Sequence, residues 1–532
     1  MKKITILLLS AVAIASGCKR FTDINQNPND PTSVTPNVVL SAALAASGNT
    51  QGTDQFNLNE WMGYWARSGN YISVQSTEQY QLNTGYADGT WQDLYTTLSK
   101  YDYIEKTALP AGPSEAFYAG VAKTMKSFHF GTLVDLFGNV PYSQAFQVNK
   151  YPTPAYDDAA TIYKNLITQL DSAVYYFGVA TTYYAHASSA VLKTDDQYDI
   201  MFGRGQSVDP ALRMKEWTQF ANTVKLRLLM NVAKAPPSGV DIAGEISKAV
   251  SANGFLPVGL NASVNPGYGN AKTSQLMPFY GQFYTTAGNP TSVTSAFFRA
   301  NTYAVNFYNA TGDTYRPGLV YTPLGNGSIG SNFDGALDAQ TNAATSSVGP
   351  GLTKAPTSDQ LIMGDFEGLF LQSEAAARGF NVGATADQLL KTAIEENFVY
   401  LGDTADDADT YYDDAAPGTG TNNPNVNYAA AVAAVGALPA SGVDKTPGLQ
   451  AIMTQEWIAL NGIDWFQSWT NYRRTGFPLS DVLGISHANT HVKNAIPYRY
   501  LYPQSEYDTN GKNIPALANG AYTPIFWDKL HN

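Results

Sequence analysis

The sequence has 532 residues, with 32 basic and 44 acidic side chains, and its formal net charge of −12 argues against nucleic acid as a partner because such a surface repels phosphate. Charged residues make up only 14% of the chain, well below the usual quarter, while Tyr is more abundant than Phe, at 34 residues against 24. We therefore expect a polar, weakly charged surface that is rich in phenols, which suits ring stacking and hydrogen bonding.

Residues 1–17 have the layout of a secretory signal peptide. Lys2 and Lys3 precede the apolar stretch 4–14, which is too short to span a membrane and is followed by the small residues 15–17. Cys18, the only cysteine, follows this segment directly, as in a lipoprotein box. At such a box the chain is cut before the cysteine, and the thiol is then acylated. An ordinary signal with a chance cysteine is the alternative, since Ala15 stands where such boxes usually have Leu.

Residues 18–36 predict an extended tether. Pro28, Pro31 and Pro36 disfavour a helix there, and the Asn and Asp residues between them favour turns.

Residues 37–532 are expected to form a single domain. No later segment is apolar for long enough to span a bilayer, so the mature chain is expected to hang from a membrane without crossing it. Loss of Lys2 and Lys3 leaves 30 basic against 44 acidic residues, a net charge of −14.

A helical hairpin is predicted next. Residues 90–108 carry an apolar stripe from Trp91 to Ile104, and Pro110 with Gly112 ends the pattern. Residues 114–138 follow as a second helix, with Ser114 placed to cap its start and Gly138 to end it.

Similar apolar stripes recur at 157–177, 216–234, 358–380, 385–402 and 448–478. Helix pairs repeated along one chain predict a mainly all-α fold of tetratricopeptide-like helical hairpins, although no strict tetratricopeptide consensus is present.

Two stretches interrupt these helices. Residues 251–357 lose the periodicity and are rich in Gly, Asn, Ser, Thr and aromatic residues, which predicts a long loop-rich insertion. Residues 403–427 predict a second, more acidic and mobile insertion. Its Asp residues could hold Ca²⁺, but the run from Asp403 to Asp414 lacks a calcium-loop pattern, so a solvated acidic loop is favoured.

Six segments along the chain carry recognisable motifs, namely "FTDINQNPNDPTSVTPNVVLSAAL" (21–44), "LVDLFGNVPYSQAF" (133–146), "EWTQFANTVKLRLLM" (216–230), "FEGLFLQSEAAARGF" (366–380), "QEWIALNGIDWFQSWTNYRRTGFP" (455–478) and "IPYRYLYPQSEYDTN" (496–510). Together they resemble the SusD/RagB family of nutrient-binding outer-membrane lipoproteins, in its SusD-like branch. Val224 and Ser373 depart from the family's motifs, as do Lys19 and Arg20, which stand where members often carry acidic residues after the lipidated Cys.

The resemblance implies a helical platform held outside the cell by a lipid anchor in the outer membrane. The family's members sit as a lid on a TonB-dependent, SusC-like transporter and capture oligomeric nutrients, commonly glycans and in some members peptides. We therefore expect an oligosaccharide-binding lipoprotein without enzymatic activity or cofactor. Oligopeptide binding on the same scaffold is the alternative, and an exported glycoside hydrolase is the third hypothesis.

Candidate ligand-binding residues are aromatic, because a sugar ring packs its C–H face on an aromatic plane. Residues 59–91 mix aromatic and amide side chains, and there the candidates are Trp65, Tyr71, Tyr80 and Tyr86. Trp65 lies in a part that is equally consistent with helix core, whereas the three tyrosines lie in a stretch without periodicity and are expected on an exposed loop. Residues 265–284 supply Tyr268, Tyr280 and Tyr284, and the two stretches could converge on one pocket. Ordinary packing is the alternative for each ring.

Three other features are interpreted as structural. Arg473 and Arg474 are expected in the last turn of a helix that Gly476 and Pro478 end. His487 and His491 have metal-ligand spacing only if they are helical, and the residues between them add no carboxylate, so no metal site is predicted. No nucleophile elbow or nucleotide-binding loop is present, and no pair of carboxylates can be singled out for glycoside hydrolysis.

Overall fold

The computed structural model describes residues 34–188, 191, 197–203 and 209–531. The predicted signal peptide, the predicted lipidation site Cys18 and most of the predicted tether lie outside these residues. The predicted tether is wrong at its end, because Pro36 begins helix α2 (Pro36–Thr53). Proline is compatible with the first position of a helix, since the backbone N–H that it lacks has no intrahelical acceptor there.

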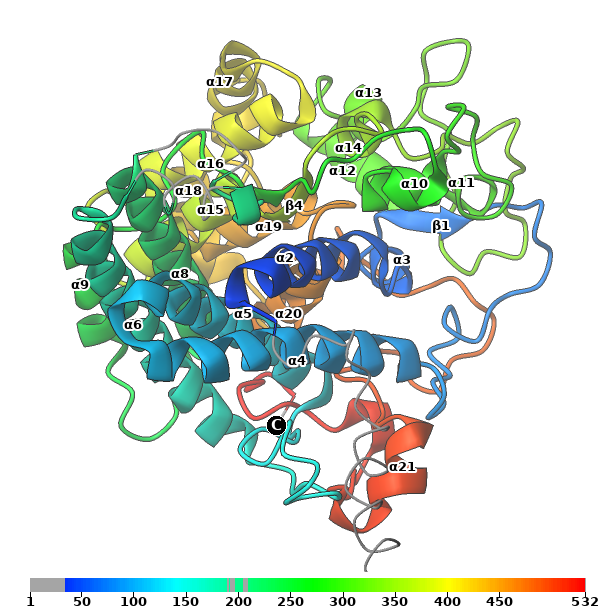
Figure 1. Ribbon diagram of the computed structural model, residues 1–532. Helices are drawn as coiled ribbons and strands as arrows, with labels where there is room; N and C mark the ends of the chain where they lie inside the picture. Colours follow the sequence, from blue (N-terminus) through cyan, green and yellow to red (C-terminus); the bar gives the residue numbers. More distant parts are fainter. Residues whose placement is uncertain (1–33, 189–190, 192–196, 204–208, 532) are drawn as a thin grey trace, which may run out of the picture.

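Consecutive antiparallel helices form most of the molecule, as predicted (Figure 1). After α2 and the one-turn helix α3 (Asn57–Trp61) come the longer helices α4 (Asp88–Ala111), α5 (Ala116–Phe137), α6 (Ala159–Tyr184), α8 (Pro210–Asn231) and α9 (Ile242–Ser251). Helix α5 packs against both α4 and α6, and α6 packs against α8. Gly138 ends α5 with a positive φ of 77°, as predicted. The predicted cap Ser114 is wrong, because it lies inside the 3-10 turn Gly112–Glu115 that joins α4 to α5.

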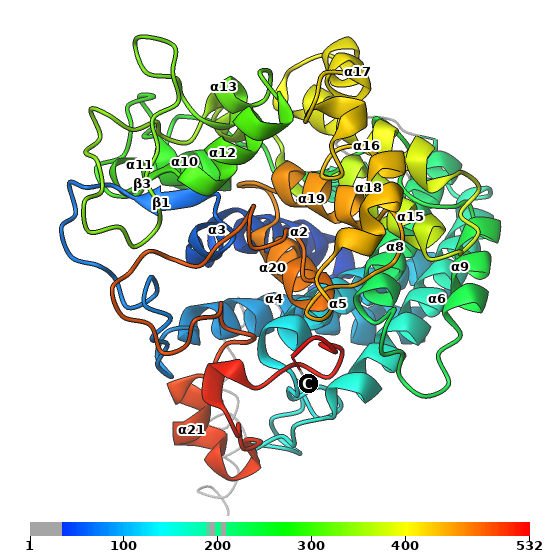
Figure 2. The same ribbon diagram turned by 180° about the vertical axis from the view of Figure 1, so that it is seen from behind.

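A second run of helices follows the insertion. It comprises α15 (Asp365–Ala377), α16 (Ala386–Leu401), α17 (Ala405–Asp413), α18 (Tyr428–Ala434), α19 (Leu449–Ala459), α20 (Trp465–Thr475) and α21 (Gln504–Asn510). Helix α20 lies in the middle of the molecule in both views, where it contacts α3 (Asn57–Trp61), α5, α8 and α19 (Figures 1 and 2). No helix in the described ranges combines the length and apolarity needed to cross a bilayer.

The acidic stretch 403–414 is more ordered than predicted. Most of it forms α17, where Thr404 accepts a hydrogen bond from the Asp407 N–H at the start of the helix. Lys391 of α16 pairs with Asp409 and Asp413. An acidic first turn is favourable at a helix N-terminus, and this explains why the negative charge did not prevent a helix.

The loop-rich insertion is confirmed between α9 and α15. It contains only short elements, namely α10 (Pro278–Phe283), α11 (Thr294–Phe297), α12 (Thr302–Thr311), α13 (Pro317–Val320), α14 (Pro350–Thr353), and the strands β2 (Ala262–Val264), β3 (Phe298–Ala300) and β4 (Gln360–Met363). Strand β2 pairs with β4, which closes the insertion at its base, and β3 pairs with β1 (Trp65–Arg67). These loops gather at one side of the molecule (Figure 1, upper right).

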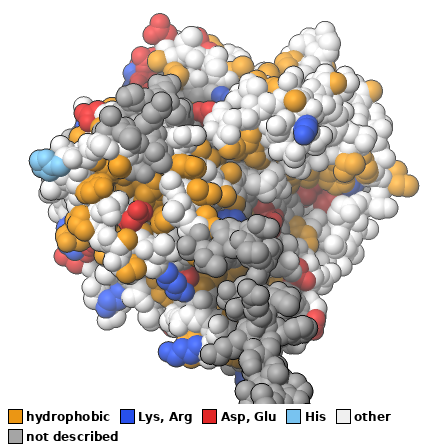
Figure 3. All heavy atoms as spheres, viewed as in Figure 1, with side chains coloured by type: hydrophobic (Ala, Val, Ile, Leu, Met, Phe, Trp, Pro, Cys, Tyr) orange, Lys and Arg blue, Asp and Glu red, His pale blue; other side chains and the backbone are white. Residues whose placement is uncertain are grey.

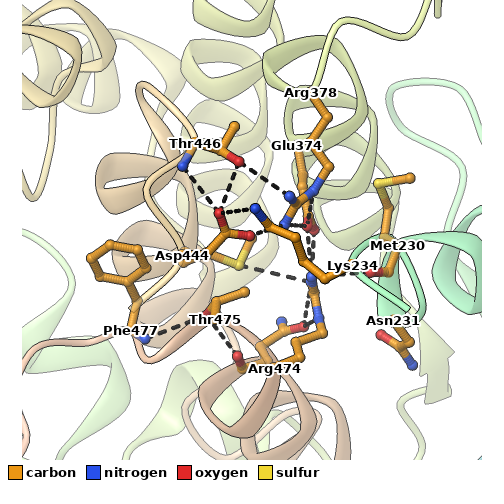
Figure 4. A network of polar contacts seen from close by, with 12 residues as sticks. Met230, Asn231, Lys234, Glu374, Arg378, Asp444, Thr446, Arg474, Thr475 and Phe477 are labelled. Atoms are coloured by element: carbon orange, nitrogen blue, oxygen red, sulfur yellow. Dashed lines mark hydrogen bonds and ion pairs between the residues drawn. The ribbon is translucent and has the colours of Figure 1, made fainter. Parts of the chain in front are cut away.

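The arginines of the "RRTG" segment are buried at the end of α20, as predicted, and Gly476 ends the helix in the left-handed conformation. Arg474 makes a two-pronged ion pair with Glu374 of α15, at 2.6 and 2.7 Å (Figure 4). Arg378 joins Glu374 to Asp444, which also binds Lys234 in the turn that follows α8. The network links α15, α20 and the turn after α8. The family-like segments 366–380 and 455–478, which supply Glu374 and Arg474, therefore have a structural role.

Candidate functional site

A short antiparallel ribbon connects the first predicted ligand stretch to the insertion. Strand β1 pairs with β3, with Ala66 opposite Arg299 and Arg67 opposite Phe298. The 68–87 loop leaves β1, and the chain enters β3 through α11, so the Ser68 N–H reaches the carbonyl of Phe297 at 2.8 Å. Two loops that lie far apart in the sequence therefore start from the same place on the surface.

A third segment, residues 330–345, closes over the same ribbon. The Gly69 N–H donates to the Gln340 carbonyl at 2.9 Å. A Cβ atom at Gly69 would lie 1.9 Å from the carbonyl oxygen of Ala339, so only glycine fits this approach. The buried side chain of Asn332 donates to the carbonyls of Arg67 and Gln340, which fixes the segment against the 68–87 loop.

Tyr71 lies where these three segments meet, and it is partly exposed, as predicted. Its ring contacts Phe297 edge to face, with the ring centroids 5.0 Å apart. Its hydroxyl reaches the Ser292 carbonyl at 3.4 Å. Sequence reasoning had no signal for Phe297, because that residue becomes a neighbour of Tyr71 only through the β1–β3 pairing.

Side-chain amides surround this aromatic pair. The Asn342 N–H donates to the Asn70 side chain at 3.0 Å, and the Gln340 side chain is exposed. Arg299 donates from Nε to the Asn342 amide oxygen at 2.9 Å, and burial lowers the pKa of its guanidinium. We call the exposed surface formed by Asn70, Tyr71, Phe297, Gln340 and Asn342 the Tyr71 platform.

Three exposed aliphatic side chains lie within a few residues of the platform in the sequence. Ile72, Val293 and Leu337 are 90%, 70% and 69% exposed, which is unusual for aliphatic residues of this size. The loop-rich side of the molecule shows few charged side chains in the space-filling view (Figure 3, upper right). The platform combines aromatic rings with an amide rim, its five side chains are all uncharged, and exposed aliphatic side chains lie close to it in the sequence.

Trp65 and Tyr80 do not lie on this surface. Trp65 is fully buried among Phe56, Phe283, Phe298 and Trp465, as expected of core. The expectation that Tyr80 is exposed is wrong, since only 2% of it is exposed. Its ring stacks on His491, and its hydroxyl accepts a hydrogen bond from the Ser486 N–H at 2.8 Å.

Tyr86 is half-buried near the start of α4, where its ring contacts Tyr500. The 68–87 loop therefore turns Tyr80 and Tyr86 toward the protein and leaves Tyr71 closest to solvent.

The second predicted stretch forms a separate groove of about 300 Å³ between α2 and α10. Tyr268 lines it together with polar side chains that include Asn49, Thr53 and Gln282. The Tyr268 hydroxyl has no hydrogen-bond partner within the part of the chain that the structure describes, and burial raises its pKa. None of the residues that line this groove comes from the 59–91 stretch, so the groove does not bring the two predicted stretches together.

Tyr280 and Tyr284 lie at the other side of α10, where their rings stack at 5.2 Å. Tyr280 is 8% exposed and Tyr284 is half-buried, so this pair offers little free ring surface.

A further groove was not predicted. A groove of about 420 Å³ lies between α4, α21 and the 141–154 turn, and it is lined by Tyr95, Phe146 and Glu506 among others. The spacing of Tyr95 on its helix indicated a core position, and the chain that forms the opposite wall is far away in sequence.

The two histidines do not form a metal site. Residues 487–491 are not helical, so the spacing that would bring both rings together is absent. His487 stacks on Phe333 with ring centroids 4.0 Å apart, whereas His491 stacks on Tyr80.

Comparisons with known proteins agree with this architecture. The model of the SusD-like family described as "Starch-binding associating with outer membrane" matches residues 28–503. No curated protein sequence matches the chain.

Similar solved structures cover nearly the whole chain. A SusD-like protein from Bacteroides thetaiotaomicron is 21% identical, with a TM-score of 0.68, and the match covers 92% of this chain and 98% of that one. A chitin-binding SusD homologue from Flavobacterium johnsoniae is 20% identical, with a TM-score of 0.70 and the same coverage. A SusD homologue from Bacteroides fragilis is 18% identical, with a TM-score of 0.68, and the match covers 93% of this chain and 100% of that one. At these identities the likeness concerns the fold.

Proposed function

Because this chain belongs to the SusD-like family of starch-binding proteins that associate with the outer membrane, we propose that it is a cell-surface lipoprotein that binds oligosaccharides. It would hold its ligand on the Tyr71 platform and deliver it to a partner TonB-dependent, SusC-like transporter. Cys18 would carry the lipid anchor, with the described domain facing the exterior of the cell.

The observation that carries the proposal is the composition of the Tyr71 platform. The Tyr71 and Phe297 rings supply apolar surface for the C–H face of a sugar ring. The side-chain N–H groups of Asn70, Gln340 and Asn342 can donate to sugar hydroxyls, whereas the amide oxygens of Asn70 and Asn342 already accept hydrogen bonds within the protein. None of the five side chains of the platform is charged, which suits a neutral ligand better than an ionic one.

The chemistry of the relatives bears on the class of sugar. One similar structure is described as chitin-binding, and the family as starch-binding. Both polymers consist of uncharged pyranose rings, so the first ligands to examine are maltooligosaccharides and chitooligosaccharides.

Isothermal titration of the mature protein would test the proposal. We expect saturable heat with at least one neutral oligosaccharide and little change in affinity between low and high salt, because the contacts are uncharged. A panel of mixed oligopeptides should give no heat. Binding of peptides without binding of any oligosaccharide would contradict glycan binding and favour the oligopeptide alternative.

The remaining hypothesis, a glycoside hydrolase, is tested by prolonged incubation. We expect every bound oligosaccharide to stay intact when the products are separated by chromatography. Released shorter sugars would contradict a purely binding role.

A further inference from the structure

Three carboxylates lie together in the interior beneath the loop-rich side. Glu60 belongs to α3, Glu78 to the 68–87 loop and Asp334 to the 330–345 segment. They are 5%, 0% and 2% exposed, and their ligand oxygens lie within 4.8 Å of one another. No sequence pattern links them, because the third position is far from the other two along the chain.

The positive charge beside these three carboxylates is too small to balance their negative charge. Arg67 donates from Nε to both oxygens of Glu78, at 3.0 and 3.2 Å. Among the described residues, Arg67 is the only basic side chain that pairs with any of the three. Three carboxylates and one guanidinium leave a net charge of −2, which is costly to bury.

The hydrogen bonds are also unevenly shared. Glu78 accepts from the backbone N–H groups of Gln75 and Gly335 in addition to Arg67. In contrast, among the described residues both side-chain oxygens of Asp334 and Oε1 of Glu60 are buried without a hydrogen bond of normal geometry. Buried carboxylate oxygens are normally satisfied, so these oxygens can still bind a cation or share a proton between the three side chains.

We propose that Glu60, Glu78 and Asp334 bind a divalent cation, with Ca²⁺ as the best fit. The ligand atoms are all oxygens, which hard cations such as Ca²⁺ prefer. Two oxygens that each lie about 2.4 Å from one Ca²⁺ are at most about 4.8 Å apart, and the ligand oxygens of the three side chains lie within this limit of one another. A charge of +2 also cancels the net charge of the cluster.

The position of the cluster connects it to the Tyr71 platform. Arg67, which holds Glu78, also donates to the carbonyls of Tyr71 and Ala336. Glu78 lies in the loop that carries Tyr71, and Asp334 lies in the segment that carries Gln340 and Asn342. A bound cation would therefore fix both loops on α3 and hold the platform in shape. This consequence for glycan binding rests on the proposed function, whereas the cation site does not.

Protons are the competing way to neutralise the cluster. Burial, together with the neighbouring carboxylates, raises the pKa values of Glu60 and Asp334 well above their usual range. Without a cation, proton uptake by these two groups would be the way to reduce the charge of the cluster. The two possibilities differ in whether the mature protein takes up metal.

The test uses the mature protein, chelated with EDTA and dialysed. Titration with CaCl₂ alone should show one saturable site per chain, and Ca²⁺ should raise the melting temperature by several degrees because it binds only the folded state. Asp334→Asn and Glu60→Gln keep the shape of the side chains but remove a charge, so each should weaken Ca²⁺ binding at least about tenfold.

The matched control is Asp413→Asn, in the exposed acidic group of α17, where 59% of the Asp413 side chain is accessible. This variant should bind Ca²⁺ as the wild type does. The proposal is overturned if the wild type neither takes up Ca²⁺ nor gains thermal stability, which is the outcome expected of shared protons. It is also overturned if Asp413→Asn lowers Ca²⁺ uptake while Asp334→Asn leaves it unchanged.

A second titration, with the best oligosaccharide from the panel, separates this inference from the proposed function. Glycan affinity should fall when Ca²⁺ is removed and recover when it is restored. Ca²⁺ binding without any glycan binding would contradict the proposed function and leave the cation site intact.

Discussion

Tyr71 is the residue on which the proposed binding surface most depends. Replacing it with Ala should weaken oligosaccharide binding by about 2- to 10-fold, because a stacking contact contributes about 0.5–1.5 kcal/mol. The melting temperature should change little, since the ring is only partly buried. Isothermal titration and differential scanning fluorimetry measure the two effects.

Tyr175→Ala is the matched control for this substitution. Tyr175 lies on α6 away from the platform and is 66% exposed, so its removal should leave glycan affinity unchanged. Equal losses from both variants would mean that Tyr71 acts through general surface chemistry and not at a ligand site.

The candidate tyrosines show what sequence can predict at the scale of single residues. The lack of periodicity after Gly69 correctly indicated a loop that carries Tyr71, Tyr80 and Tyr86. It could not indicate which rings turn inward, because Tyr80 is buried by residues near position 486 and Tyr86 by Tyr500. Those partners come from the C-terminal part of the chain, and no local pattern reports them.

His129 should make stability depend on pH. It is buried in α5 next to Ser47 of α2, and burial lowers its pKa from 6.5 to about 3. Below pH 6.5 the unfolded chain takes up a proton at this histidine and the folded chain does not. Its contribution to stability is therefore complete above pH 6.5 and is lost toward pH 3, by up to about 1.4 kcal/mol per pH unit.

Urea unfolding at several pH values between 7.5 and 5 would measure this effect. Buried acids such as Asp135, whose pKa burial raises to about 6, titrate in the opposite sense, so the comparison with His129→Gln isolates the histidine. The free energy of unfolding of the wild type should fall relative to that of the variant as the pH decreases. Parallel curves would show that His129 keeps an ordinary pKa.

At the scale of the helices, Glu374 connects α15 to α20. Burial alone would raise its pKa, but Arg474 and Arg378 outweigh burial and hold the pKa below the usual value. Glu374→Gln would leave the buried Arg474 guanidinium without its carboxylate, while Arg378 would keep Asp444, and should destabilise the protein by about 3–5 kcal/mol. Chemical denaturation measures this loss.

Asp444→Asn provides the comparison within the same network. One partner of Asp444 is Lys234, whose side chain is 51% exposed and can turn to water. The loss of stability should therefore be smaller than for Glu374→Gln. The reverse order would contradict the central position that Glu374 takes in Figure 4.

The helices themselves could be predicted well where their apolar stripes are long. The apolar stripe of residues 90–108 correctly predicted α4, because its apolar side chains are the ones buried against the rest of the protein. The acidic stretch 403–414 gave the wrong prediction, since its apolar positions are few and the stabilising partner, Lys391, comes from α16. The same limit applies to the cation cluster, whose three acids come from three different segments.

At the scale of the whole molecule, the predicted lipid anchor is tested by Cys18→Ser. The chain carries no other cysteine, so loss of this thiol should remove every acyl chain and move the protein from the membrane fraction to the soluble fraction. Fractionation followed by immunoblotting measures the shift. An unchanged membrane-bound pool would contradict lipidation at Cys18.

The overall architecture was predictable because the resembling segments are spread along nearly the whole chain and several of them meet in the core. Arg474 from one segment and Glu374 from another form a buried ion pair, for example. The Tyr71 platform was only partly predictable, because strand pairing between β1 and β3 joins loops whose sequences contain no signal for one another.

A crystal structure of the mature protein with the oligosaccharide that binds most tightly would test the central claim most directly. We predict that a sugar ring lies on Tyr71, between the 68–87 loop and the 330–345 segment, and that Asn70 or Asn342 contacts its hydroxyls. A ligand bound instead in the α2–α10 groove beside Tyr268, or in the groove beside Tyr95, would contradict the claim.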